Sequence, residues 1–512
     1  MNLIKRNIFA NYIGSIWMAL MSFAFVPIYI RFLGIESYGL IGFFAALQGM
    51  FALMDMGIST TLNREMASLS VQSNKTSFMR DSVRTLEIVY WAMAFILCLI
   101  VVSLSGIIAN HWINPKTITI ETVENAIKLM GVIIAFRWPL NFYFGGLKGL
   151  QCQVLQNSIN SVAATLRGVG AIFILWLVSP TIEAFFMWQV LISALQTVIT
   201  RWFLWRILPK DIGRARFRLE VLNGSWRFAA GITGIMVIDT ILTQLDKIIL
   251  SKMLTLEMFG YYSLATVVAI QLRSLFTPIF DAVYPKFTNL STLGTQTALV
   301  KLYHKSCQAM SVIILPTALV IAFFSYEILL LWTHNPTTAN QTYLFVSIMI
   351  IGTAINGLMN IPYALQLANG WPGLTLKINI ISLIIFVPYI ILITKYFGAL
   401  GAATTWPLLN AFQMILNIHN MHRRLLPSEK SKWVLTDVGL PLFTSLIIVG
   451  FGKLLIGDHQ TARPFLLLSL FSVSTISLFV TAIITPEVRH QFFITLKEIP
   501  FFRNRIKIFQ NN

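Results

Sequence analysis

The sequence predicts an all-α membrane protein of about fourteen transmembrane helices, arranged as two pseudo-symmetric six-helix bundles plus a C-terminal helix pair. Of the 512 residues, 56% are hydrophobic and 11% are charged, whereas a soluble protein carries about 25% charged residues. Apolar runs long enough to cross a bilayer recur along the whole chain. The two halves also repeat a short motif in the same orientation, which is typical of membrane proteins built from two related bundles.

The apolar runs are the first element of this prediction. A lipid-exposed backbone must satisfy its own hydrogen bonds, and these runs lack the alternation of barrel strands, so each run is expected to be a helix. The expected spans are residues 9–30, 38–62, 85–109, 125–147, 155–178, 182–205, 226–250, 258–284, 306–332, 341–368, 374–394, 398–420, 434–456 and 463–485.

Lysine and arginine residues between the spans predict the orientation of the chain. With the N-terminus inside, 27 of these residues fall in cytoplasmic segments and 6 on the opposite side, which is the bias that cytoplasmic loops show. We therefore expect both termini to be cytoplasmic. The net charge of +18 is explained by this distribution, so nucleic acid is not an expected partner.

The basic segments also predict the division of the chain into bundles. The richest basic segment, from Arg201 to Arg227, falls near the middle of the chain, and a second one follows the twelfth span. The expected parts are an N-terminal bundle (1–206), a cytoplasmic basic linker (207–225), a second bundle (226–421), an extra helix pair (434–485) and a cytoplasmic basic tail (486–512).

A repeated motif relates the two halves. Residues 32–39 read FLGIESYG after the first span, and residues 253–260 read MLTLEMFG after the seventh. The shared leucine, glutamate, aromatic residue and glycine are all offset by 221 positions. Two halves of the same orientation, related by an axis along the membrane normal, are a transporter architecture with a cavity between them.

Charged residues within the predicted spans are the candidate site residues, because such charges are costly and usually face a bundle interior or a water-filled cavity. The basic candidates are Arg137, Arg167 and Arg273, with Lys247 nearer the outer end of its span. Guanidinium groups bind phosphate oxygens through paired hydrogen bonds, so we expect anion contact in the cavity. The alternatives are that the arginines pair with aspartates and that Lys247 snorkels.

Helical spacing adds polar neighbours to these charges. Residues three, four and seven apart share a helix face. This spacing places some amides on the same faces as Arg137 and Arg167, and others on one face of the tenth span. The resulting candidates for the cavity lining are Asn141, Asn157, Asn160, Asn356 and Asn360. Such stripes can instead hold helices together. Asp239 and Asp246, seven apart, are candidates for ion or proton coupling or for balancing a nearby cation.

Three stretches near the N-terminus, PIYIRFLGIESYGL (27–40), MDMGI (54–58) and NRE (63–65), resemble the polysaccharide transporter family. These proteins are the Wzx-type O-antigen flippases of the multidrug/oligosaccharidyl-lipid/polysaccharide exporter superfamily. Further matching points are LDKII (245–249), FTP (276–278), YP (284–285) and GALGAA (398–403). The resemblance implies a V-shaped pair of six-helix bundles, an extra helix pair, and alternating access for glycans linked to undecaprenyl pyrophosphate in a bacterial inner membrane.

The function expected from the sequence is therefore a lipid-linked oligosaccharide flippase for O antigen or a similar surface polysaccharide. The expected partners are this substrate, membrane lipid, and a polysaccharide polymerase with other assembly proteins. No catalytic residue, cofactor or metal site is expected, since the chain has no Walker loop and its three cysteines are widely spaced. One alternative is a cation-coupled multidrug exporter of the same fold. The other is a membrane glycan polymerase, which is disfavoured by short outer loops.

Overall fold

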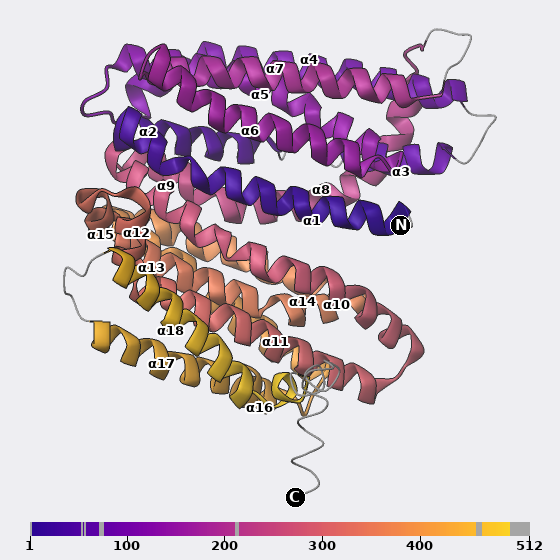
Figure 1. The fold of residues 1–512 in the computed structure, drawn as a ribbon. Helices are drawn as coiled ribbons and strands as arrows, with labels where there is room; N and C mark the ends of the chain where they lie inside the picture. Colours follow the sequence, from indigo (N-terminus) through magenta and orange to yellow (C-terminus); the bar gives the residue numbers. More distant parts are fainter. Residues whose placement is uncertain are drawn as a thin grey trace, which may run out of the picture. The chain divides into compact units, whose positions relative to one another are not determined.

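The computed structural model describes residues 3–52, 55, 58–70, 76–209, 215–456 and 463–491, and within these ranges it contains helices and no strand. The chain divides into two compact units, Met1–Ser263 and Leu264–Asn512. Figure 1 shows both units as packed helices. The all-α prediction is confirmed for the described residues.

The first unit is built around long helices that pack side by side. Its helices are α1 (Leu3–Ala24), α2 (Val26–Ala52), α3 (Ile58–Leu69), α4 (Thr76–His111), α5 (Ile120–Gly149), α6 (Gln153–Leu177), α7 (Ile182–Ile207) and α8 (Leu219–Met253), while α9 (Leu256–Gln271) extends across the division. In its core, α4 packs on α5 and α5 packs on α7 (Figure 1). The rings of Trp138 and Phe142 lie 4.6 and 4.9 Å from that of Tyr90, so aromatic packing fixes α5 against α4.

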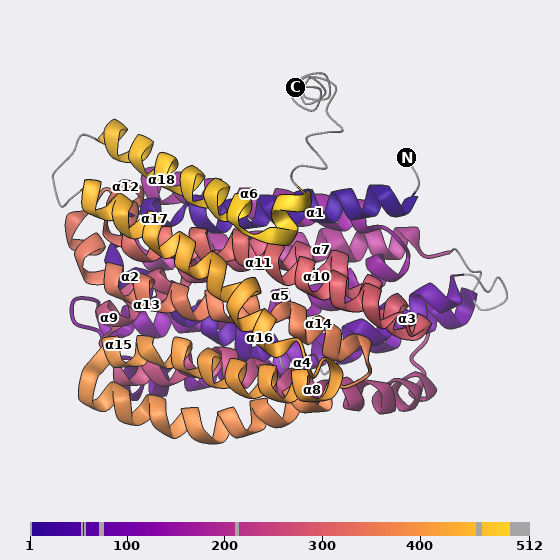
Figure 2. The ribbon, with the colours of Figure 1, turned by 90° about the horizontal axis from the view of Figure 1, so that it is seen from below.

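The second unit contains the remaining helices. They are α10 (Arg273–Leu293), α11 (Gln296–Phe323), α12 (Ser325–Thr333), α13 (Pro336–Leu358), α14 (Asn360–Ala368), α15 (Gly373–Leu425), α16 (Lys430–Lys432), a π-helical segment (Trp433–Gly439), α17 (Leu440–Ile456) and α18 (Arg463–Ile484). Helices α17 and α18 run side by side (Figures 1 and 2) and pack on α11. They correspond in sequence to the predicted helix pair 434–485.

Two kinked helices affect the count of membrane spans. Within the described residues, ten helical stretches are long and apolar enough to cross a membrane. One of them, α15, has 53 residues and would be about 80 Å long if continuous, but the backbone at Gly398 is non-helical (φ 59°), so two helices meet there. Gly34 (φ 78°) breaks α2 in the same way. The count of fourteen stays a prediction.

The two copies of the repeated motif pack against each other within the first unit. A methyl group added at Gly39 would lie closer than 3.0 Å to the carbonyl oxygen of Leu256, and one added at Gly260 would meet the carbonyl oxygen of Ile35 in the same way. Each contact is the other shifted by 221 positions. The contact is therefore reciprocal, as expected for two related helix corners that meet at a local twofold axis.

The compact units do not divide at the basic segment of the sequence. Helix α8 follows that segment, yet it packs on α2, α3 and α4 of the first unit. Asp81 on α4 holds the start of α8, because its carboxylate accepts hydrogen bonds from the backbone of Arg216 (2.7 Å) and from Nε of Arg218 (2.6 Å). The predicted bundle boundaries therefore stay a prediction, and residues 210–214 of the linker lie outside the described residues.

Candidate functional site

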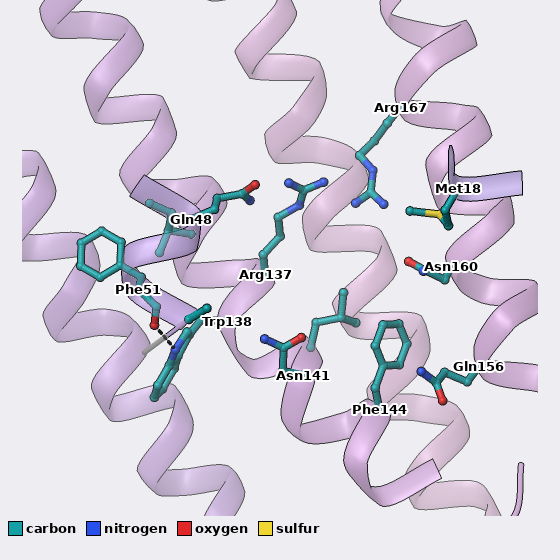
Figure 3. Close-up of a pocket in the computed structure, with 13 residues that line it drawn as sticks. Met18, Gln48, Phe51, Arg137, Trp138, Asn141, Phe144, Gln156, Asn160 and Arg167 are labelled. Carbon is teal, nitrogen blue, oxygen red and sulfur yellow. Dashed lines mark hydrogen bonds between the residues drawn. The ribbon is translucent and has the colours of Figure 1, made fainter. Parts of the chain in front are cut away.

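A cavity of about 430 Å³ opens among four helices of the first unit. Its lining comes from α1 (Met18), α2 (Gln48, Phe51, Ala52), α5 (Ile134, Arg137, Trp138, Leu140, Asn141, Phe144) and α6 (Gln156, Asn160, Arg167). Figure 3 shows the amides and the two guanidinium groups directed into one space, with apolar side chains and the ring of Trp138 as walls. A volume of this size is within the range of pockets that bind small molecules.

Arg137 and Arg167 carry the positive charge of this cavity. Both side chains are half-buried, and their guanidinium groups enter the cavity from α5 and α6 (Figure 3). Neither forms an ion pair with a carboxylate of the described residues, and no described residue of the lining is acidic. Arg137 lies instead 5.9 Å from the centre of the Phe44 ring. Two unneutralised cations in a half-buried cavity favour binding of an anion.

Three carboxylates of the first unit, those of Glu87, Asp81 and Asp55, have partners outside the cavity. Glu87, whose side chain is 2% exposed, pairs with Arg84 (3.0 Å) and Arg201 (2.7 Å). Asp81 pairs with Arg218. Asp55 accepts hydrogen bonds from Tyr90 and from Ser59, which is a structural role at the end of a predicted span. These pairings leave the two cavity arginines without acidic partners among the described residues.

Gln196 on α7 does not line the cavity but positions two residues that do. Its side chain is buried, with 2% exposure. Its Oε1 accepts a hydrogen bond from Nη1 of Arg167 at 2.8 Å, and its Nε2 donates to Oδ1 of Asn160 at 3.2 Å. A neutral amide therefore positions two lining residues and leaves the charge of Arg167 uncompensated. Sequence spacing could not reveal this residue, because it belongs to a different helix from its partners.

Helix spacing identified part of the polar lining. It placed Asn141 with Arg137 and Asn160 with Arg167, and the structure brings all four into the cavity. Asn157 is not among the lining residues; its Nδ2 donates to Oδ1 of Asn11 on α1 at 2.6 Å.

Three further polar residues line the cavity that were not predicted from helical spacing. Gln156 lies four residues before Asn160, so the same rule of spacing would have found it. Gln48 lines the cavity without a charge nearby in sequence to mark it, and Trp138 follows Arg137 directly but is not three, four or seven residues from it. Gln48 in particular comes from α2, and only the packing of α2 beside α5 brings it to Arg137 (Figure 3).

The candidates that lie in the second unit, Arg273, Asn356 and Asn360, do not line the cavity of the first unit. Arg273 is the first residue of α10, and Thr277 donates to its backbone oxygen. Asn356 on α13 donates to Asn410 on α15 at 2.9 Å, which joins two helices. Asn360 donates to the backbone oxygen of Asn356 at 2.9 Å. Their role in lining a transport path stays a prediction.

The charged candidates of α8 lie outside the lining of this cavity. Lys247 donates to the backbone oxygen of Thr243 and to Oε1 of Gln244, each at 3.1 Å. Asp246 accepts a hydrogen bond from the hydroxyl of Tyr262 at 3.1 Å, while its Oδ1 is buried with no hydrogen-bond partner among the described residues. A buried oxygen of this kind is costly unless it binds a proton or an ion. The side chain of Asp239 lies outside the described residues.

Two curated proteins and two solved structures show what this chain is similar to. It is 21% identical over 408 residues to a protein of Shigella flexneri assigned as an O-antigen transporter, covering 79% of this chain and 94% of that one. It is 22% identical over 373 residues to the lipopolysaccharide biosynthesis protein WzxC of Escherichia coli (strain K12), covering 72% and 73%. These relatives are named for transport and for polysaccharide biosynthesis and not as enzymes, in agreement with the prediction that the chain is not an enzyme.

The fold matches solved transporters across almost the whole chain. The lipid II flippase MurJ in an inward closed conformation aligns with a TM-score of 0.73 at 13% identity, covering 93% of this chain and 98% of that one. An inward-facing multidrug resistance MATE family transporter of the MOP superfamily aligns with a TM-score of 0.67 at 12% identity, covering 81% and 96%. These matches establish the fold of a multi-pass membrane protein.

The sequence profile of the family described as polysaccharide biosynthesis protein matches residues 4–291. This range includes the repeated motif and every residue that lines the cavity. It also covers more than half of the chain. The resemblance stated from the sequence motifs is confirmed, and the chain belongs to the polysaccharide biosynthesis protein family.

Proposed function

We propose that this protein is a flippase that moves an oligosaccharide linked to undecaprenyl pyrophosphate from the cytoplasmic to the periplasmic leaflet of a bacterial inner membrane. The observation that carries the proposal is the cavity with two unpaired arginines and no acidic lining residue in the described part of the chain (Figure 3). A pyrophosphate offers several anionic oxygens, and guanidinium groups bind such oxygens through paired hydrogen bonds.

The cavity also suits the sugar next to the phosphate. Its amides, from Gln48, Asn141, Gln156 and Asn160, can donate to hydroxyl groups and accept from them, and Trp138 supplies an aromatic wall. In this proposal the head group occupies the cavity while the isoprenoid tail stays in the bilayer. Alternating access then exposes the head group to the other side, with both termini of the protein in the cytoplasm.

The membrane potential assists this direction of transport. With the cytoplasm negative, moving one negative charge outward gains about 2.3 kcal/mol per 100 mV. In addition, Asp246 is our candidate for ion or proton coupling, supported by its buried and unpartnered Oδ1. Arg273 and Lys247 remain proposed anion contacts at other stages of the cycle. The proposed protein partners are a polysaccharide polymerase and other assembly proteins.

A cation-coupled multidrug exporter is disfavoured by the same cavity. A site for a cationic drug requires carboxylates and aromatic rings, whereas the described lining places two cations and four amides beside its aromatic walls.

The test is replacement of Arg137, Arg167 and Arg273 singly by Ala and by Lys in a strain that lacks the chromosomal copy. Surface polysaccharide is measured together with the abundance of the transporter in the membrane. We expect export to fall at least tenfold for Arg137→Ala and Arg167→Ala, with less loss for the Lys variants, because each Ala variant removes a charge-assisted contact of about 1.5–3 kcal/mol.

The structure offers a matched pair of controls on one helix. Asn160 lines the cavity and Asn157 does not, so Asn160→Ala should reduce export more than Asn157→Ala at equal abundance. Normal export by all the arginine variants at normal abundance would refute the proposed anion contact.

A further inference from the structure

A buried cluster of titratable groups joins the C-terminal helix pair to α11, far in sequence from the cavity of the first unit. His304 on α11 is 1% exposed, and Asp437 in the π-helical segment is 0% exposed. Nδ1 of His304 lies 2.5 Å from Oδ2 of Asp437, and Nε2 of the same ring lies 2.9 Å from Oε2 of Glu429. Both ring nitrogens therefore face a carboxylate oxygen.

The two contacts need two protons, one between each ring nitrogen and its carboxylate oxygen. A neutral imidazole and two ionised carboxylates supply only one. A neutral imidazole has one N–H, and its other nitrogen is an acceptor with a lone pair. If both carboxylates were ionised and the ring neutral, one nitrogen lone pair would face an oxygen lone pair at hydrogen-bond distance. The contacts are both favourable only when a second proton is present, on the ring or on one of the carboxylates.

The surroundings fix the carboxylate of Asp437 toward this ring. Its other oxygen accepts a hydrogen bond from Nε2 of Gln308 at 2.8 Å, and Oε1 of Gln308 accepts from the backbone nitrogen of Glu487 at 2.8 Å. Asp437 lies in the π-helical segment Trp433–Gly439. Such segments are rare and are frequent at functional sites. The network thus joins α11 to the segment that precedes α17 and to the segment that follows α18.

Other titratable groups also face the cluster. They come from α11, the end of α15 and the segment around α16, and they are Tyr303, Cys307, His422, Lys430 and Lys432. Of these, Tyr303 donates or accepts at His422 Nε2 (3.2 Å) rather than at His304. Among the described residues, neither lysine forms an ion pair with Asp437 or Glu429. The negative charge of the two carboxylates is therefore compensated mainly by protons.

We propose that His304, Asp437 and Glu429 form a proton-binding site, and that the bound proton holds the C-terminal helix pair against α11. Glu429 is the side of the site that meets solvent, since its side chain is 23% exposed while the other two are buried. Protons reach Asp437 from the solvent through Glu429 and the two nitrogens of His304. Loss of the second proton places two like lone pairs in contact and weakens the docking of α16, α17 and α18.

The test is the unfolding temperature of the purified full-length protein in detergent between pH 6 and pH 8.5. A native state that binds one more proton than the unfolded chain loses stability as the pH rises. The wild type should therefore lose about 1 °C per pH unit beyond any change shared by all variants, because one proton is worth about 1.4 kcal/mol per pH unit and the unfolding entropy grows with chain length. In Glu429→Gln, the amide can donate to Nε2 of a neutral ring whose Nδ1–H binds Asp437, so the second proton is no longer needed and this loss should disappear.

His304→Gln removes the imidazole ring that joins the two carboxylates and should likewise remove the loss. If that variant does not fold, Glu429→Gln decides, because its position is part-exposed and its shape is unchanged. The control is His111→Gln, an exposed histidine at the end of α4 in the first unit, which should keep the wild-type dependence. Wild-type dependence in both Glu429→Gln and His304→Gln, or its loss in the control, would overturn the proposal.

A local measurement tests the docking itself. Tryptic cleavage at Lys430 and Lys432 is measured at each pH and divided by the cleavage rate of an unfolded peptide of the same sequence. We expect this ratio to rise with pH in the wild type and to stay constant in Glu429→Gln. A ratio that is constant in the wild type would show that the proton does not hold the helix pair.

Discussion

Replacing Gln196 by glutamate should reduce transport about tenfold to a hundredfold without disturbing the fold. The variant keeps the shape of the side chain but places a negative charge 2.8 Å from Nη1 of Arg167. The amide of Asn160 must then turn so that its Nδ2 donates to the second carboxylate oxygen. At an effective dielectric constant of about 20, the attraction of such a pair is about 6 kcal/mol. Burial of the new carboxylate costs several kcal/mol and offsets most of this gain, so we expect the stability to change by less than about 2 kcal/mol.

The effect on an anionic substrate should be much larger. In Gln196→Glu the new carboxylate neutralises Arg167, and the cavity retains one uncompensated cation in place of two. The lost charge-assisted hydrogen bond is worth about 1.5–3 kcal/mol, which corresponds to binding about tenfold to a hundredfold weaker. Surface polysaccharide should fall accordingly at unchanged abundance of the transporter.

The assay combines export in the deletion strain with binding of an isoprenyl pyrophosphate to the purified variant. Asn157→Asp is the matched control, because it adds one negative charge to α6 at a position that faces α1 rather than the cavity. If Gln196→Glu binds the pyrophosphate and exports as well as Asn157→Asp, the inference that Arg167 must remain unneutralised is wrong.

Three further predictions concern packing and buried polar groups. Gly39→Ala should destabilise the protein by about 1–3 kcal/mol through overpacking. Adding Gly260→Ala to this variant should cost less than Gly260→Ala costs in the wild type, because the first methyl group already separates the two corners. Additive shifts in unfolding temperature would contradict the reciprocal contact. Glu87→Gln should lower the free energy of unfolding by about 1–3 kcal/mol, since the carboxylate is buried but its arginine partners are half-exposed. A change below about 0.5 kcal/mol, which is typical of surface substitutions, would refute this prediction. Asn356→Leu should cost about 0.6 kcal/mol if the bond to Asn410 only joins two helices, and lost export at normal abundance would show a role in the transport path instead.

Local patterns in the sequence were sufficient to predict the helical class and the repeat. Long apolar runs cross a bilayer only as helices when their backbones face lipid, and this argument needs no knowledge of tertiary contacts. The motif at residues 32–39 and 253–260 predicted related halves, and the structure shows its two copies packed against each other through Gly39 and Gly260. Charge depth and helix spacing likewise predicted that Arg137, Asn141, Asn160 and Arg167 belong to polar faces of their helices.

Sequence spacing does not determine which polar faces meet. Asn157 and Asn160 are three residues apart, yet the first binds α1 and the second lines the cavity with Gln196 behind it. Gln48 reaches the same cavity from α2. In the same way, His304 and Asp437 are 133 residues apart, and their contact depends on the docking of the helix pair on α11.

The sequence by itself therefore determined the membrane class, the all-helical class and the cationic residues of the first unit, because each follows from local hydrophobicity, helix period and charge. Only the tertiary structure decided that two arginines share a cavity without a described acidic partner, and that a histidine lies between two carboxylates. The physical reason is that a helix period fixes the direction of a side chain around its own axis, whereas the neighbour that it meets depends on how whole helices pack.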